Sequence, residues 1–338
     1  MTGHWTGLSS SNVPWTLVVF LALLSVPFLG SRFYTFVATD IIILALFATS
    51  LNLLLGTTGL VTFGHAAYFA IGAYACALLM KVWSVPFPLA FVAGGIVAAG
   101  FASVFGFFCV RLTKIYFAML TLAFAQIVWA ICFKWNEVTG GEQGLPNVPY
   151  PELGWMEALP LLDAFRAGER FYLVALVLVA LAFAALRRLV LSPFGRVLTL
   201  IRDNPERAQF IGVNVRGYRL AAFVVAGFFA GLSGALSGIF NRGVFPDFAF
   251  WTKSAEPLIM TILGGMGHFW GPAVGAAALI LLNQQITSYT EYWPFVLGTV
   301  LIVLLFVFPG GIAGTLAKAA RRGRHKSGAA AQSVRRHA

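Results

Sequence analysis

Long apolar segments follow one another along almost the whole chain, and this succession constrains the fold more than any other feature. About 20 consecutive apolar residues form a helix that crosses the roughly 30 Å hydrocarbon core of a bilayer. Hydrophobic residues make up 59% of the chain and charged residues 10%, against about 45–50% and about 25% in soluble domains. With a mean hydropathy of +0.84, the sequence predicts an all-α, polytopic membrane protein.

The apolar segments predict about ten transmembrane helices, one of which, at residues 254–267, is short enough to be half a crossing that is buried in protein. The predicted helices lie at residues 15–30, 34–55, 59–80, 87–110, 115–133, 171–186, 220–240, 254–267, 271–288 and 293–308. They give a transmembrane domain at residues 15–317, between an N-terminal segment (1–14) and a basic tail (318–338).

Basic residues predict the orientation, because loops that hold Lys and Arg stay on the cytoplasmic side of the membrane. The net charge of +11 comes from such loops and from the tail, so it indicates topology rather than nucleic-acid binding. Residues 192–219 are basic and are expected in the cytoplasm, as is the tail. Residues 136–170 carry half of the acids of the chain and are expected to form an extracytoplasmic loop. Both termini are then predicted to be cytoplasmic.

The stretch Ser192–Arg219, here called the island, is polar and basic although apolar segments flank it. Ser192-Pro193 and Asn204-Pro205 each combine a capping residue with proline at the first helical position, which is a helix-start signal. Gly212 suits the left-handed residue that ends a helix. The island is therefore predicted to contain two short helices.

One face of the first island helix is apolar, because Phe194, Val197, Leu198 and Ile201 follow helical spacing. Two interpretations fit such an amphipathic helix between spans. It forms a docking surface for a cytoplasmic protein, or it belongs to a basic loop that lies on lipid headgroups.

Two glycine-interrupted segments, at residues 56–74 and 263–277, are the places where the sequence predicts a transport pathway. Each contains Gly-His, six further residues and then Gly-Ala. Paired interruptions in the two halves of a chain indicate a pathway at a repeat interface. Small residues at this spacing also simply let helices pack closely, so both interpretations stay open.

Polar side chains within the spans are functional candidates, because a bilayer disfavours them. His65 is one, although a neutral histidine that bonds to a neighbouring helix fits equally well. Thr121 and Gln126 either line a polar path or join helices by hydrogen bonds, and Glu256 is expected in the headgroup layer. The predicted pathway residues are Gly64, His65, Tyr68, Gly72, Thr121, Gln126, Gly264, Gly265 and Gly267.

Several classes of chemistry lack support in the sequence. There is no GxxxxGK[ST] loop for nucleotide hydrolysis. Cys76, Cys109 and Cys132 lie in apolar segments without a CxxC motif, so they are expected to pack in the core rather than bind a metal. The chain is therefore not expected to be an enzyme or to bind a metal or cofactor.

Four segments carry a more specific pattern: GLVTFGHAAYFAIGAY; RLTKIYFAMLTLAFAQIV with TGGEQGLPNVP; PFGRVLTLIRDNPERAQFIGVNVRGYRLAAFVVAGFFAGLSGAL; and ILGGMGHFWGPAVGAAAL. In combination they resemble the LivH/LivM-type permeases of ABC importers for branched-chain amino acids, specifically the LivM type. The resemblance spans most of residues 51–282, and His268 departs from the small polar residue of the family pattern.

The resemblance implies a permease subunit of an ATP-driven importer for leucine, isoleucine and valine in the bacterial inner membrane. It implies a homologous LivH-type permease that shares the pathway, two ATPase subunits that use ATP and Mg, and a periplasmic substrate-binding protein. A permease for urea, another small amide or another amino acid is the alternative. An ion-coupled secondary carrier and a membrane scaffold are further alternatives.

The resemblance also implies that the two island helices, at residues 193–202 and 204–211, are the coupling element that enters a groove of the ATPase. Arg202, Asp203, Glu206 and Arg207 would supply polar contacts, and the apolar stripe would supply anchors. The expected coupling residues are Phe194, Leu198, Ile201, Arg202, Asp203, Glu206, Arg207 and Gly212.

Overall fold

The computed structural model describes residues 20–29, 31–112, 114–151, 167–287, 293–307 and 310–315. The expectations for residues 1–14 and for the basic tail (318–338) lie outside the described residues, as do residues 152–166 of the predicted acidic loop.

Helices make up most of the described chain. The longer ones are α2 (Arg32–Asn52), α3 (His65–Lys81), α4 (Phe87–Cys109), α5 (Lys114–Lys134), α8 (Ala167–Leu191), α11 (Val215–Phe240), α12 (Trp251–Gly264), α13 (Gly271–Thr287) and α14 (Trp293–Val307). The shorter ones are η2 (Val26–Leu29), η3 (Leu53–Thr58), α6 (Asn136–Thr139), η4 (Gly141–Gln143), α9 (Pro193–Asp203), α10 (Pro205–Phe210) and η5 (Pro246–Ala249). Two short strands, β1 (Leu145–Pro146) and β2 (Gly243–Val244), pair antiparallel.

In the described part of the chain, five helices are long and apolar enough to cross a membrane. They are Arg32–Thr58, Phe87–Cys109, Ile115–Lys134, Ala167–Leu191 and Val215–Phe240. They confirm the expected all-α, polytopic architecture, whereas the number of ten crossings stays a prediction. Helix α12 has 14 residues and is therefore about 21 Å long, which is less than the roughly 30 Å core.

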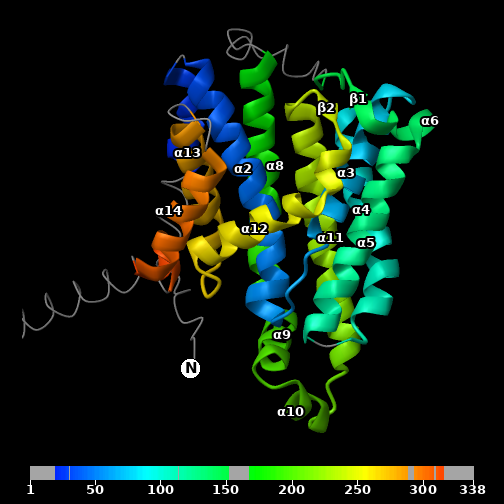
Figure 1. Cartoon of the computed structure of the whole chain (residues 1–338), viewed down its shortest axis with the longest axis vertical. Helices are drawn as coiled ribbons and strands as arrows, with labels where there is room; N and C mark the ends of the chain where they lie inside the picture. The colour runs from blue at the N-terminus through cyan, green and yellow to red at the C-terminus, as the bar shows by residue number, and fades with distance from the viewer. Residues whose placement is uncertain are drawn as a thin grey trace, which may run out of the picture.

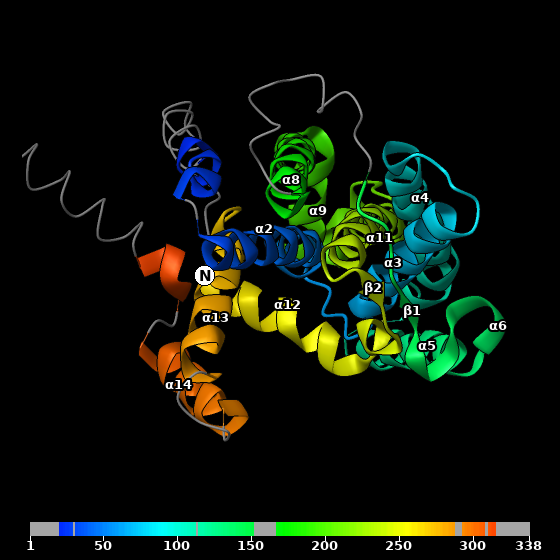
Figure 2. The same cartoon turned by 90° about the horizontal axis from the view of Figure 1, so that it is seen from above.

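Helix α11 lies at the centre of the bundle and packs against α3, α4 and α2 (Figure 2). Helix α8 covers another side of α2, and α12 crosses one face of the bundle from the side of α5 to α13 (Figure 2). Helix α14 lies beyond α13 at the edge. The buried apolar side chains of these helices form one large core.

The two ends of the bundle differ in character. The island helices α9 and α10 lie at one end, and α6, β1 and β2 lie at the other (Figure 1). The described part of the acidic stretch and the island are therefore at opposite ends, which is the relation that the charge pattern predicts. Which end faces the cytoplasm stays a prediction.

Glycines bring helix backbones into direct contact in both glycine-interrupted segments. A Cβ at Gly72 of α3 would lie 2.2 Å from the carbonyl oxygen of Gly231 in α11. A Cβ at Gly275 of α13 would lie 1.8 Å from the carbonyl oxygen of Met260 in α12. Gly72 and Gly275, the glycines of the two Gly-Ala pairs, are thus both positions at which two helices pack closely.

We expect Gly72→Ala to destabilise the protein by about 1–3 kcal/mol, because α3 and α11 must separate to admit the methyl group. Thermal unfolding in detergent measures the effect. Gly100→Ala in α4 is the matched control, because nothing lies within 4 Å of a Cβ there, and alanine has the higher helix propensity. An equal melting temperature for the two variants would contradict the packing argument.

Candidate functional site

The chain departs from regular α-helix between α2 and α3. Helix α2 ends in the π-helical turn η3, and Gly59 follows with a φ of +75°. Residues 59–64, here called the linker, are not helical, and α3 begins at His65. Non-helical backbone at membrane depth is tolerated only where protein buries it or where it lines a cavity.

Hydroxyl groups bind the N–H groups at the end of the linker. The N–H of Phe63 donates to Thr121 Oγ1 of α5 at 3.3 Å, and the N–H of Gly64 donates to Thr62 Oγ1 at 3.2 Å. The N–H of Ala66 donates to Ser254 Oγ of α12 at 2.9 Å. These side chains supply acceptors for the N–H groups that have no partner within a helix at its first turn.

His65 is a fully buried core residue. Its Nε2 lies 2.8 Å from Ser50 Oγ of α2, and its ring stacks on Phe47 with centroids 5.3 Å apart. Tyr68, one turn later, is also buried and contacts Phe223 of α11 edge-on. This geometry corresponds to the histidine that bonds to a neighbouring helix, one of the two interpretations that the sequence left open.

The predicted pathway residues fall in separate places. Gly64, His65 and Thr121 meet where the linker joins α3, and a Cβ at Gly64 would lie 2.2 Å from the carbonyl oxygen of Thr121. Gly264, Gly265 and Gly267 lie at the turn between α12 and α13, with Gly265 at a φ of +111°. Gln126 is half-buried on α5.

The island folds into the two predicted helices, α9 and α10. The side chain of Asn204 accepts a hydrogen bond from the N–H of Arg207 at 2.9 Å and so caps α10. Gly212 has the predicted left-handed conformation, with a φ of +86°. Ser192 precedes α9 as predicted, but its hydroxyl donates to the carbonyl of Leu189 at 2.6 Å instead of capping the helix.

The apolar stripe of α9 faces the protein itself. Leu198 and Ile201 are fully buried, and Phe194 stacks on Tyr218 of α11 with centroids 5.6 Å apart. Leu198 and Ile201 therefore hold the island in place and cannot serve as anchors for a partner, which corrects that expectation. The exposed apolar side chains of the island are Phe210, at 89%, and Ile211, at 65%.

Arg202 joins the island to the end of the η3 turn. Its guanidinium donates to the carbonyl of Gly56 and lies 3.3 Å from the Asp203 carboxylate. Its aliphatic part covers Gly59, where a Cβ would lie 2.7 Å from Arg202 Cγ. Glycine thus satisfies two constraints at position 59, namely the positive φ and the approach of Arg202.

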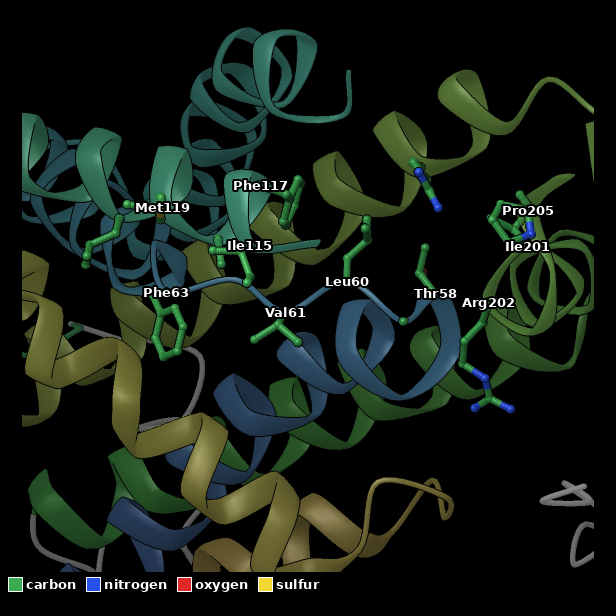
Figure 3. Close-up of a pocket in the computed structure, with 14 residues that line it drawn as sticks. Thr58, Leu60, Val61, Phe63, Ile115, Phe117, Met119, Ile201, Arg202 and Pro205 are labelled. Atoms are coloured by element: carbon green, nitrogen blue, oxygen red, sulfur yellow. The ribbon is translucent and has the colours of Figure 1, made fainter. Parts of the chain in front are cut away.

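A cavity of about 690 Å³ lies between the linker, the start of α5 and the island. Leu60, Val61 and Phe63 of the linker lie beside Ile115 and Phe117 of α5 in Figure 3. Ile201, Arg202 and Pro205 lie at the island end of the same cavity (Figure 3). Arg219 of α11 also borders it. The cavity is thus mainly apolar with two arginines, and the predicted pathway residues, all within the described chain, do not border it.

Sequence reasoning missed three features of this site. The Arg202–Gly56 bond joins positions 146 residues apart, and no local pattern reports such a contact. Ser254 gave no signal because it was read only as the start of a short span. Phe210 is the last residue of a helix of six residues, which is too short for a periodic pattern.

The fold and the site define a polytopic helical membrane protein with a structured polar island at one end. Residues 33–305 match the family described as "Branched-chain amino acid transport system / permease component". Because this match covers most of the chain, the protein belongs to that family.

Individual relatives agree with the family. The chain is 30% identical to the high-affinity branched-chain amino acid transport system permease protein LivM of Escherichia coli K12, over 85% of this chain and 71% of that protein. It is 25% identical to the corresponding LivH protein of the same organism, over 80% of this chain and 91% of that protein. No solved structure matches the chain.

We expect Arg202→Ala to increase hydrogen exchange in the linker and in α9 by about 10-fold or more, because a hydrogen bond from a charged group contributes about 1.5–3 kcal/mol. Exchange is measured by mass spectrometry on protein in nanodiscs. Arg207→Ala is the matched control, because this arginine is exposed. Equal protection in both variants would show that Arg202 does not hold the linker.

Proposed function

We propose that this chain is the membrane-spanning permease subunit of an ATP-driven importer for leucine, isoleucine and valine. The observation that carries the proposal is the family match over residues 33–305. The similarity to both LivM and LivH supports a second, related permease as the partner. Two such subunits would form the translocation pathway between them.

The remaining subunits follow from the same proposal. Two ATPase subunits that use ATP and Mg would bind the cytoplasmic face, with the island as the coupling element of this chain, and a periplasmic binding protein would deliver substrate at the opposite end. The chain itself would bind no cofactor. It would reside in the bacterial inner membrane with both termini in the cytoplasm, in accordance with the basic residues of the island and the tail.

The exposed side of the island fits a protein docking surface better than a loop on lipid headgroups. Phe210 and Ile211 project from it, and Asp203, Glu206 and Arg207 are exposed beside them. Apolar side chains surrounded by charges of both signs are typical of protein interfaces, whereas a membrane-surface helix concentrates basic residues on its polar face. The island presents Phe210 and Ile211 as the apolar anchors.

Movement of the island would reach the pathway by two routes. One runs through the attached helices α8 and α11. The other runs through Arg202, which contacts Gly56 and Gly59 directly and so connects the island to the linker. A push on the island would displace the linker together with α8 and α11, which is a form of two-state switching between packed arrangements.

We expect Phe210→Ala to weaken binding of the ATPase subunits by about 10-fold or more, because an exposed aromatic anchor is a typical interface hot spot. Co-purification from native membranes, with mass spectrometry of the retained subunits, measures this loss. The second permease should remain bound. Trp83→Ala is the control, because Trp83 is 68% exposed and follows Lys81, which contacts β1 at the opposite end. Loss of both partners in Phe210→Ala would contradict a specific coupling role.

We also expect the reconstituted complex to take up leucine in a manner that requires ATP and the binding protein. Uptake of radiolabelled leucine into proteoliposomes is compared with uptake of urea. Uptake of urea without leucine would favour the amide alternative. Uptake that depends on an ion gradient and continues without ATP would favour a secondary carrier.

A further inference from the structure

A charged cluster of two side chains, Lys253 and Glu256, lies inside the transmembrane domain, at a distance from the island. Lys253 Nζ donates to Glu256 Oε2 at 2.7 Å, and the two residues are one turn apart on α12. Helix α12 starts at Trp251, so Lys253 lies within it although the sequence predicted a span that begins at residue 254.

The cluster lies at the depth of the hydrocarbon core. Helix α2 and η3 together form a span of 27 residues from Arg32, which is about 40 Å long. A core of about 30 Å would leave roughly 5 Å of this span outside at each end. Thr261 of α12 donates to the carbonyl of Ala48 in α2 at 3.2 Å, and Ala48 is about 24 Å from the start of the span. Helix α12 therefore lies at the depth of the core, and Glu256 lies with it rather than in the headgroup layer.

The open side of the cluster faces protein or water rather than lipid. The Lys253 side chain is 22% exposed and that of Glu256 is 39% exposed in the single subunit. Charged groups that face lipid at this depth are strongly disfavoured, whereas those in a transport protein face its interior or a water-filled path. Helix α12 crosses one face of the bundle (Figure 2), so a second permease that covers this face would enclose the cluster.

The groups present match the charges of a free α-amino acid. Carboxylates accept hydrogen bonds from an ammonium group, and the three donors of a lysine ammonium can hold two carboxylates at once. Lys253 can therefore bind the carboxylate of a ligand. Glu256 is then free to bind the ammonium of the same ligand. The ring of the buried Phe69, whose centroid is 5.9 Å from Lys253 Nζ, packs behind the lysine on the protein side.

We propose that Lys253 and Glu256 form a binding site for the carboxylate and ammonium groups of a zwitterionic α-amino acid on the exposed side of α12. The incoming ligand replaces the Lys253–Glu256 ion pair with two new pairs, so that no buried charge is left without a partner. The inference rests on the proposed function, because it specifies how that function handles the polar part of the substrate.

The test uses the complete importer in proteoliposomes and measures the initial rate of leucine uptake. Lys253→Gln and Glu256→Gln should each reduce uptake at least about 10-fold, while the second permease and the ATPases still co-purify. The exchanged pair, Lys253→Glu with Glu256→Lys, preserves an ion pair and so supports folding, but it should not restore uptake. Lys134→Gln and Glu137→Gln are controls at the same spacing on exposed positions of the chain, and uptake should be unchanged in both.

Three results would overturn the inference. Full uptake by the exchanged pair would show that the residues form a structural ion pair only. Loss of the second permease from the single variants would place the cluster in the interface between subunits. Wild-type rates in every variant would remove any role in transport. By contrast, absence of leucine uptake in the wild-type complex would contradict the proposed function itself, and the inference with it.

Discussion

The need to satisfy backbone polar groups inside an apolar bundle governs this structure. A continuous helix meets this need by itself, but the chain departs from regular helix between α2 and α3. The N–H groups at the end of the linker are bonded to the hydroxyls of Thr62, Thr121 and Ser254, which come from three parts of the chain. The positions of α5 and α12 are therefore tied to the start of α3, and with them the cavity and the charged cluster.

The island is attached to the same part of the bundle, at one end of the molecule. Leu198 and Ile201 fix it to the bundle, Arg202 reaches the carbonyl at Gly56, and Phe210 and Ile211 remain available to a partner. One short segment thus has an inner face for packing and an outer face for docking. This division suits a permease that must respond to a separate ATPase without containing a nucleotide site.

Local patterns in the sequence predicted the apolar helices, the two island helices and the left-handed Gly212, because each depends on residues near one another in the chain. Periodicity also grouped Leu198 with Ile201 correctly. It could not show that α8, α11 and η3 cover this face rather than a partner, since helical spacing says nothing about the neighbour. The pairing of Lys253 with Glu256 was missed because the predicted span began at residue 254, after the charged Lys253, whereas α12 begins at Trp251.

The linker has a mechanical consequence. A long unbroken helix tilts as a rigid rod, so any rearrangement of such a helix must repack every neighbour along its length. A short segment held by side-chain hydroxyls allows α3 to swivel about a few backbone torsions, since a hydroxyl can turn to follow a displaced N–H group. Residues 59–64 therefore have the properties of a hinge. Because Arg202 of the island contacts Gly59, a displacement of the island would act directly on this hinge.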